Sequence, residues 1–477
     1  MTRESSPGGA GSRAANSEYL QKRQLKQGAA GWILLASLGV SYVISGDFAG
    51  WNLGIGTGGF GGMLIATVLM AVMYSAMVLS LAELSSSLPT AGGGYSFARR
   101  ALGPWGGYIT GTAILLEYAI APAAIAIFIG GYVDSLVGLD GPLVYAAFYI
   151  VFVGIHLWGA GEALRIMMGI TALAVIALVV FILAMLPHFD AARLFDMPVS
   201  DAVGASSFLP EGYLGIWSAI PFAMWLFLAI EGVPLAAEES REPGRDMPRG
   251  IIAAMALLLL FAICMLLLAP GGAGAQAMST SAAPLVDALQ AVYGEGSAAA
   301  AFVNVVGLFG LIASFFSIIF GYSRQVFALS RAGYLPRTLS VTNRRRAPTL
   351  ALVVPGVIGF LLSLTGQGDL MITMAVFGAT ISYAMMMLSH LLLRTREPAL
   401  ARPFRTPGGR FTSALALGLA VIAFLSTFVV SLVAALWAGV FYAIMLAWFG
   451  FYSRHHLVAQ APEEEFDAIE SAESELG

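Results

Sequence analysis

SGDFAGWN, at residues 45–52, interrupts the first long apolar run of the chain. The run covers residues 31–57, and a helix that crosses the apolar core of a bilayer takes only about 20 residues. Irregular backbone at membrane depth is tolerated only where it is buried in protein or lines a wet cavity. Two glycines and a carboxylate in the middle of this run therefore predict a broken membrane helix with a functional site at the break.

A second apolar run, over residues 213–236, is interrupted in the same way by AIEGVP at residues 229–234. Each interruption places a carboxylate beside a glycine, with Asp47 in the first and Glu231 in the second. Paired broken helices in corresponding positions of two halves are the best sequence pointer to the substrate site of a secondary transporter. The position of the breaks and the topology therefore indicate two structural repeats, spans 1–5 and 6–10.

Apolar runs of spanning length recur twelve times, which predicts an all-α polytopic membrane protein without a large soluble domain. The connection at residues 271–298 contains an amphipathic pattern after Pro284 and predicts a short helix on the outer face, either a lid or an inert surface helix. The expected spans lie near residues 31–57, 61–86, 104–134, 142–158, 163–187, 213–236, 249–270, 299–328, 347–366, 369–393, 412–432 and 434–453.

Composition excludes an ordinary soluble enzyme. Hydrophobic residues make up 58% of the 477 residues, charged residues only 11%, and the mean hydropathy is +0.82. A soluble chain has about 25% charged residues to cover its surface. The single cysteine, Cys264, rules out an internal disulfide and a cysteine-based metal cage.

The basic residues are distributed in one set of loops. With a cytosolic N-terminus, all 24 Lys and Arg residues except Arg193 fall on the inside, as the positive-inside rule requires. We therefore expect a multi-pass protein of the cytoplasmic (inner) membrane with both termini cytosolic. Basic runs beside spans set orientation, so no nucleic-acid partner is expected.

The topology divides the chain into four parts. Residues 1–29 are polar, lack a signal-peptide pattern and predict a disordered cytosolic tail. Residues 30–395 form the expected inverted-repeat transport core, residues 396–454 hold spans 11 and 12, and residues 455–477 form an acidic cytosolic tail.

Three local motifs then carry a resemblance to a known family. Three stretches are similar to signatures of the amino acid-polyamine-organocation superfamily. They are residues 82–96, which run from AEL to GGGYS, residues 237–248 with the sequence AEESREPGRDMP, and the SR, A, R, G and LP positions within residues 323–336. The second motif departs from the family in having Glu242 where Asn is usual. The resemblance implies a leucine-transporter-like fold with five-plus-five inverted repeats, broken helices 1 and 6, and alternating access.

Within that superfamily, three stretches resemble the ethanolamine permeases. They are residues 45–52, Leu116-Glu117-Tyr118, and residues 225–232 with the sequence WLFLAIEG. This resemblance implies a secondary active transporter that imports ethanolamine or a similar small primary amine. The alternative is a proton-coupled amino acid permease or an amino acid/amine exchanger. A membrane enzyme or sensor is disfavoured because neither a catalytic constellation nor an appended domain is visible.

Asp47 distinguishes these readings. The N-terminal end of an opened helix is positive and favours an anion. In an amino acid carrier the substrate supplies that anion, whereas here Asp47 can supply it, which favours an ammonium substrate without a carboxylate. Alternatively, Asp47 caps the second half-helix and does not touch substrate.

The other candidate residues flank the two breaks or lie at one end of the spans. The aromatic candidates either form a wall for an ammonium through cation–π attraction or serve only in packing. The substrate-binding candidates are Ser45, Gly46, Asp47, Phe48, Gly50, Glu117, Tyr118, Trp225, Phe227, Ala229, Glu231 and Gly232, and the gate or coupling candidates are Glu83, Glu117, Glu231 and Arg324.

The coupling ion stays open at this point. Family members that couple to protons can use a lysine in span five, where this chain has Ala174. The alternatives are protonation of Glu117 or Glu231, sodium near Ser314 or Ser317, exchange, or no coupling. No cofactor and no structural metal are expected, and the oligomeric state is not predicted.

Overall fold

The structure is a computed structural model that describes residues 30–90 and 92–457. Most of the described residues are helical, and no strand longer than an isolated bridge occurs among them. The predicted tail at 1–29 lies outside the described residues, as does most of the predicted tail at 455–477.

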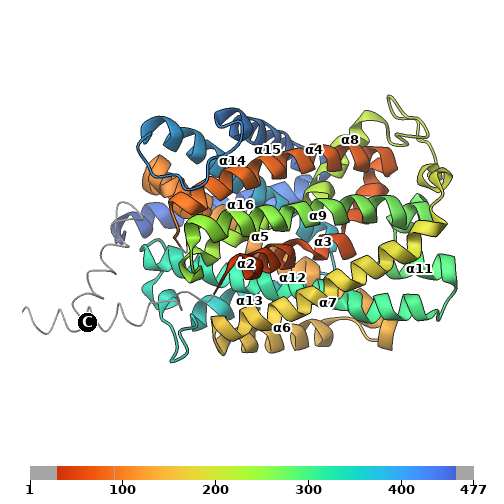
Figure 1. The fold of residues 1–477 in the computed structure, drawn as a ribbon, viewed down its shortest axis with the longest axis horizontal. Helices are drawn as coiled ribbons and strands as arrows, with labels where there is room; N and C mark the ends of the chain where they lie inside the picture. The colour runs from red at the N-terminus through yellow and green to blue at the C-terminus, as the bar shows by residue number, and fades with distance from the viewer. Residues whose placement is uncertain (1–29, 91, 458–477) are drawn as a thin grey trace, which may run out of the picture.

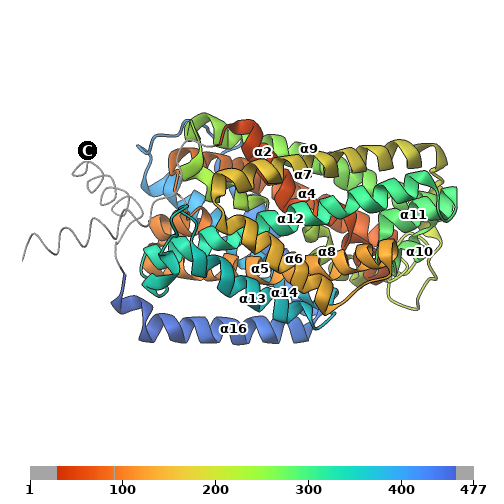
Figure 2. The ribbon, with the colours of Figure 1, turned by 90° about the horizontal axis from the view of Figure 1, so that it is seen from below.

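The helices run side by side along the long axis of the molecule (Figures 1 and 2). Their order is α2 (Trp32–Val43), α3 (Ser45–Phe48), α4 (Trp51–Ser87), α5 (Gly94–Val137), α6 (Pro142–Leu157), α7 (Ala160–Met185), α8 (Gly212–Trp225), η3 (Ile230–Glu239), α9 (Pro243–Ala273), α10 (Ala275–Ser279), α11 (Pro284–Tyr293), α12 (Ala298–Arg331), α13 (Thr349–Ser363), α14 (Gly368–Arg396), α15 (Arg410–Val430) and α16 (Leu432–Phe451).

Nine helical segments of the described chain are long and apolar enough to cross a membrane, and three shorter apolar helices, α2, α6 and α13, accompany them. Their positions agree with the predicted apolar runs. A helix that crosses the bilayer must be long enough for its apolar core and must carry apolar side chains there, so the helix and the apolar run coincide. The chain is therefore a multi-pass membrane protein, as predicted.

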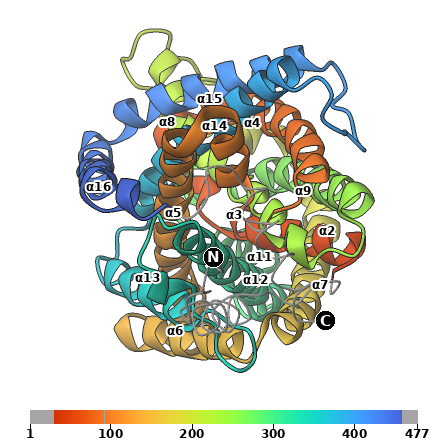
Figure 3. The ribbon, with the colours of Figure 1, turned by 90° about the vertical axis from the view of Figure 1, so that its left-hand side faces the viewer.

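The helices differ in how deeply they are packed. The most apolar windows of α5 and α14 are 78% buried, whereas that of α16 is only 22% buried. The end-on view shows α3 near the centre of the bundle and α16 and α6 at its periphery (Figure 3). The peripheral helices thus present their apolar faces outward, as lipid-facing spans do.

The first break lies later than predicted. Ser45–Phe48 form the helical turn α3, and only Ala49, which is extended, and Gly50 separate it from α4. Gly50 has a φ of 96°, which residues with a side chain rarely adopt. The expected break at 45–50 was therefore wrong for its first four residues, because they extend the preceding helix by one turn.

The second break lies earlier than predicted. Helix α8 ends at Trp225, residues 226–229 form turns, and the 3₁₀-helix η3 begins at Ile230. Ala229 has a φ of 74°, a conformation that is costly for a residue with a Cβ atom. Glu231 and Gly232 thus lie in the first turn of η3, not in the break itself.

The predicted helix after Pro284 is confirmed as α11. Its buried residues Leu285, Ala288 and Leu289 form the apolar face of the predicted pattern. In the preceding connection, Met278 and Ser281 accept hydrogen bonds from the Asn52 side chain through their carbonyl oxygens, both at 2.9 Å. The segment before α11 is therefore tied directly to the chain that follows the first break.

Candidate functional site

Glu117 and Glu231 are buried beside the same tyrosine hydroxyl inside the bundle. Glu117 comes from α5 and Glu231 from the first turn of η3, and their exposed fractions are 0% and 2%. The Tyr118 hydroxyl donates a hydrogen bond to Glu231 Oε1 at 2.7 Å. The Tyr383 hydroxyl lies within 3.3 Å of an oxygen of each carboxyl group, so the structure brings together two of the three predicted acidic candidates.

Tyr383 of α14 links this acid pair to a third element. Its hydroxyl lies 2.8 Å from Glu231 Oε2 and 3.3 Å from Glu117 Oε1. The Ala229 N–H points to the same hydroxyl at 3.4 Å, as does the hydroxyl of Tyr74 from α4. Sequence reasoning missed Tyr383 and Tyr74; the available signal was a phenol, which needs a partner when buried, inside an apolar span.

Gly232 allows two further tyrosines to approach the pair. The rings of Tyr42 and Tyr118 stack with centroids 6.1 Å apart. A Cβ atom on Gly232 would lie 2.7 Å from Tyr42 and 2.8 Å from the Tyr118 hydroxyl. A Cβ atom on Gly321 of α12 would lie 2.9–3.0 Å from the same two tyrosines. Glycines on both sides are therefore required for this tyrosine pair to fit.

Asp47 is buried away from that network. Its exposed fraction is 0%, and neither carboxylate oxygen has a hydrogen-bond partner among the described residues. It lies in α3, and Gly50 occupies the N-cap position of α4, which contradicts the alternative that Asp47 caps the second half-helix. The thiol of Cys264 in α9 lies within electrostatic range of this carboxylate.

Trp225 joins the two breaks. Its indole N–H donates to the Ala49 carbonyl at 3.0 Å, and a Cβ atom on Gly50 would lie 2.6 Å from the same nitrogen. A Cβ atom on Gly46 would lie 2.5 Å from the Trp225 carbonyl oxygen. The predicted candidates Gly46, Gly50 and Trp225 therefore serve the close packing of the two breaks.

The four aromatic candidates have different ring neighbours. Phe48 packs against glycines of α12, and its carbonyl accepts a hydrogen bond from Tyr132 at 3.0 Å. Phe227 faces Tyr74 with ring centroids 5.4 Å apart. Within the described chain, no ring contact joins Phe48, Tyr118, Trp225 and Phe227 to one another. These side chains lie around the site as separate pairs.

Serines connect α2 and α3 to α12. The Ser45 N–H donates to Ser314 Oγ at 2.8 Å, and the Ser41 and Ser317 hydroxyls bond each other. Ser317 Oγ also donates to the Ala313 carbonyl at 2.8 Å. The serines that were considered for sodium thus already have protein partners.

Glu83, a gate candidate, lies at the end of the bundle that carries the arginine-rich loops 332–348 and 397–409, which we call the basic end. Its carboxylate accepts hydrogen bonds from Arg394 at 2.5 and 2.9 Å and from the Thr406 N–H at 2.7 Å. Arg402 Nε lies 3.0 Å away and His390 Nε2 lies 3.3 Å away. Glu83 therefore ties α4 to α14 and to the loop before α15.

Arg324, the other gate candidate at the basic end, forms a second buried ion pair. Its guanidinium lies 2.6 Å from Glu239 at the end of η3, and the two side chains are 3% and 1% exposed. The pair fixes the end of η3 against α12. It thus connects the segment that carries Glu231 to the basic end.

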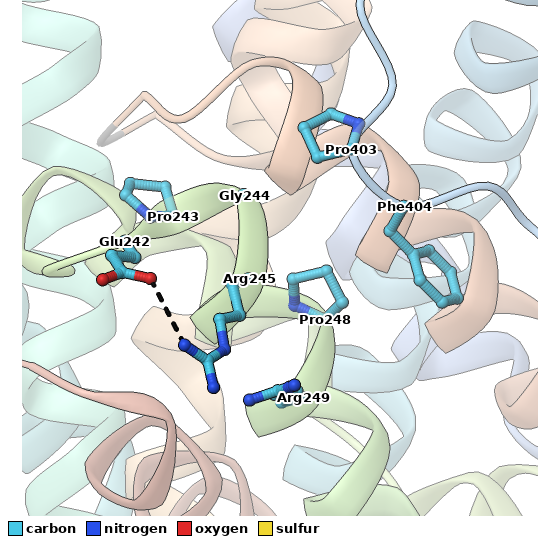
Figure 4. A pocket seen from close by; sticks show the side chains of 8 residues that line it. All are labelled: Glu242, Pro243, Gly244, Arg245, Pro248, Arg249, Pro403 and Phe404. Atoms are coloured by element: carbon cyan, nitrogen blue, oxygen red, sulfur yellow. Dashed lines mark ion pairs between the residues drawn. The ribbon is translucent and has the colours of Figure 1, made fainter.

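An open pocket of about 590 Å³ lies beside the start of α9, at the basic end (Figure 4). A 3.7 Å ion pair joins Arg245 to Glu242 at its rim. None of the predicted site residues lines this pocket, whose walls are formed by Glu242, Pro243, Gly244, Arg245, Pro248, Arg249, Pro403 and Phe404.

A bundle of apolar helices with two broken segments that contact each other, and with buried carboxylates beside the breaks, is typical of the class of membrane transporters. Residues 31–450 match the family model described as amino acid permease, and the chain belongs to this family. It is a transporter of the amino acid-polyamine-organocation superfamily and not an enzyme, as its three motifs indicated.

Three relatives show the range of this family. An uncharacterized transporter of Rhizobium meliloti is 28% identical over 76% of this chain and 78% of its own. A branched-chain amino acid permease of Bacillus subtilis is 26% identical over 93% and 96%. A methylthioribose transporter of the same organism is 24% identical over 78% and 82%. Relatives at this distance thus carry chemically different substrates.

Proposed function

We propose that this transporter imports ethanolamine or a similar small primary amine across the cytoplasmic membrane by alternating access. In this proposal Asp47 is a counter-charge for the ammonium. The single observation that carries the proposal is that three buried carboxylates, Asp47 in α3 and, separately, the pair Glu117 and Glu231, have no basic partner among the described residues. A buried charge without a partner is strongly destabilising, so a cationic substrate completes this site.

The backbone of the first break supports a substrate without a carboxylate. The Ala49 N–H donates to the Ser45 carbonyl at 3.0 Å, and the Gly50 N–H donates to Asn52 Oδ1 at 3.1 Å. These amides are engaged inside the protein, whereas a carrier that holds a substrate carboxylate on the break needs free amides there. Charge and backbone thus favour the same class of substrate.

The architecture of the proposal follows from the helices. We propose that the nine long helical segments and the three shorter ones form twelve spans, with the breaks in the first and the sixth of them. We propose that spans 1–10, within residues 30–395, form the inverted-repeat core and that α15 and α16 are added to it. The basic end then faces the cytosol and both tails lie there, by the positive-inside rule.

The comparisons favour a second candidate. The relative that covers 93% of this chain is named a branched-chain amino acid permease. Import of a branched-chain amino acid is therefore the alternative function. Its substrate would bring its own carboxylate next to the buried acids, which is electrostatically unfavourable.

Uptake into proteoliposomes distinguishes the two candidates. We expect the purified protein to take up labelled ethanolamine and unlabelled ethanolamine to compete, while leucine does not. Asp47→Asn is expected to lower uptake at least about tenfold, since a buried charge pair is worth more than 1.4 kcal/mol. Asp369→Asn, in the exposed first turn of α14, is the matched control. Uptake of leucine without ethanolamine would contradict the substrate, and undiminished uptake by Asp47→Asn would contradict the role of Asp47.

A further inference from the structure

An apolar groove of about 460 Å³ opens on the side of the bundle between α13 and α16, and we call it the lateral groove. All the residues that line it are hydrophobic or proline. Its two walls carry large exposed side chains, among them Val354 and Ile358 of α13 and Trp437 and Ile444 of α16. The end-on view shows α13 and α16 at the periphery of the bundle, next to α5 (Figure 3). The groove therefore faces the lipid that surrounds the spans.

The lateral groove has about the depth of one leaflet. Its lining positions extend from Trp437 to Met445 on α16 and from Val354 to Leu362 on α13. Eight residues of helix rise about 12 Å, and half of the apolar core of a bilayer is about 15 Å thick. A single acyl chain that enters from one membrane surface thus matches the groove in length and in polarity.

One end of the lateral groove lies at the basic end of the bundle. Leu335 and Leu339, from the loop 332–348, line the groove there. The Tyr334 carbonyl in the same loop accepts hydrogen bonds from the Trp448 indole at 3.1 Å and from the Ser453 hydroxyl at 2.8 Å. These bonds hold the end of α16 against the loop, so both segments form one rim of the groove.

Two exposed arginines belong to this rim. Arg337 begins the 3₁₀-helix η4 (Arg337–Ser340), and Arg454 lies in the 3₁₀-helix η5 (Ser453–His455) after α16. Neither arginine forms an ion pair within the part of the chain that the structure describes. Arg454 Nε donates to the ring of His455 at 2.8 Å, which leaves its terminal nitrogens available. The rim therefore offers two guanidinium groups, which suit the oxygens of a phosphate.

We propose that the lateral groove binds an anionic phospholipid of the leaflet at the basic end. One acyl chain lies in the groove between α13 and α16, and the phosphate of the head group binds Arg337 and Arg454. Basic pockets between spans on the cytosolic side are known to bind anionic head groups. This lipid is a second ligand beside the transported substrate, so the inference does not depend on which substrate is carried.

A second copy of the chain is the competing occupant of the groove. A dimer with two-fold symmetry places the same patch of both subunits at the interface. Arg337 and Arg454 of both copies would then gather at one interface, where like charges repel. The charge of the rim therefore favours an anionic lipid over a second copy.

The floor of the lateral groove connects the lipid to the interior. Leu116 of α5 lines the groove directly before Glu117, and Val326 of α12 lines it two residues after Arg324. An acyl chain in the groove packs against both of these helices. Since a ligand that binds only the folded state stabilises it, the bound lipid should raise the midpoint of thermal unfolding.

Native mass spectrometry of the full chain in detergent tests the proposal. The probes are phosphatidylglycerol and phosphatidylcholine with the same two oleoyl chains, so that only the head group differs. We expect the wild type to retain phosphatidylglycerol at least about tenfold more than phosphatidylcholine, because each arginine near an anionic lipid favours binding about fivefold. Phosphatidylglycerol should also raise the midpoint of thermal unfolding, and phosphatidylcholine should not. Equal retention of the two lipids would overturn the proposal.

Paired arginine variants locate the head group. Arg337→Gln with Arg454→Gln is expected to abolish the preference for phosphatidylglycerol. Arg344→Gln with Arg345→Gln is the matched control, because it removes the same charge from exposed arginines of the basic end. Arg345 lies over the ring of Trp158, at the end of α6, with 5.8 Å to the ring centroid. An equal loss of preference in the two double variants would show that only the overall charge matters and would refute the site.

A tryptophan pair on α16 tests the acyl chain. Val440→Trp fills the lateral groove and is expected to abolish the rise of the unfolding midpoint with phosphatidylglycerol. Val433→Trp, which is also exposed on α16 but does not line the groove, is expected to keep that rise. Gel filtration establishes that all variants are folded. A dimeric mass that Val440→Trp converts to a monomer, without retained lipid in the wild type, would assign the groove to a second copy and overturn the proposal.

Discussion

The hydroxyl of Tyr383 in α14 donates a hydrogen bond to Glu231 in η3 at 2.8 Å, across the turn at which the sixth span is broken. The same oxygen accepts from the backbone N–H of Ala229, the last residue of the break, at 3.4 Å. One side chain therefore fixes both the strained backbone of the break and the carboxylate beside it. A movement that separates α14 from η3 would break these two bonds.

Removing the Tyr383 hydroxyl should weaken transport more than folding. In Tyr383→Phe the carboxylate of Glu231 loses a donor, and a hydrogen bond to a charged group is worth about 1.5–3 kcal/mol. We expect kcat/KM for ethanolamine uptake to fall about tenfold or more. Tyr213→Phe is the control, because this ring is 61% exposed near the start of α8. Equal uptake by the two variants would contradict a role for Tyr383 in the site.

A methyl group on Gly232 should destabilise the site. It would lie within 2.8 Å of Tyr42 and Tyr118, and overpacking of this kind costs about 1–3 kcal/mol. Gly232→Ala is therefore expected to lower the midpoint of thermal unfolding in detergent and to reduce uptake. Gly439→Ala in α16 has open space around it and is expected to change neither. A Gly232→Ala protein as stable and active as this control would show that the tyrosine pair is not closely packed.

Loss of the Glu83 charge should destabilise the basic end. Glu83→Gln leaves the guanidinium of Arg394 without the carboxylate that lies 2.5 Å away. Breaking a buried pair on one side costs about 3–5 kcal/mol, and we expect a loss of about 3 kcal/mol in the free energy of unfolding. Glu397→Gln is the comparison, because the Glu397 side chain is 30% exposed whereas that of Glu83 is 2% exposed, and pairs with an exposed carboxylate are worth about 1 kcal/mol or less. Denaturant titration in micelles measures both, and similar losses would argue against a central role for Glu83.

The Arg324–Glu239 pair should show non-additive effects. Arg324→Leu or Glu239→Leu alone leaves one buried charge, whereas the double variant leaves none. We expect the double variant to be more stable than either single variant by about 1–3 kcal/mol. If the pair acts as a gate, the double variant should bind ethanolamine and yet transport it at an altered rate. Additive losses in the double-mutant cycle would refute direct coupling between the two residues.

Much of the fold was predictable from the apolar runs alone. The spans and α11 lie where the sequence predicts them, because a bilayer fixes the length of a helix and requires its surface to be apolar. The breaks were displaced by a few residues: α3 adds a turn that contains Asp47, and the second break ends at Ala229. Local propensity does not determine such boundaries, since contacts such as the Trp225 indole on the Ala49 carbonyl fix them.

The candidate site was predictable only in part. Glu117 and Glu231 stand out because a carboxylate inside an apolar span is costly and therefore functional by default. Tyr74 and Tyr383 did not stand out, because an aromatic residue in a span is equally suited to packing.

By itself, the sequence determined that this chain spans a membrane, that two of its apolar runs are broken, and which carboxylates lie within apolar runs. These properties follow from the cost of moving each segment out of water, which depends on local composition. Only the tertiary structure decided that Glu117 meets Glu231 while Asp47 has no hydrogen-bonding partner, and that Tyr383, 266 residues from Glu117 along the chain, bonds the pair. Such pairings depend on how separate helices pack against one another, because a hydrogen bond forms only where two helices bring its donor and acceptor within about 3 Å.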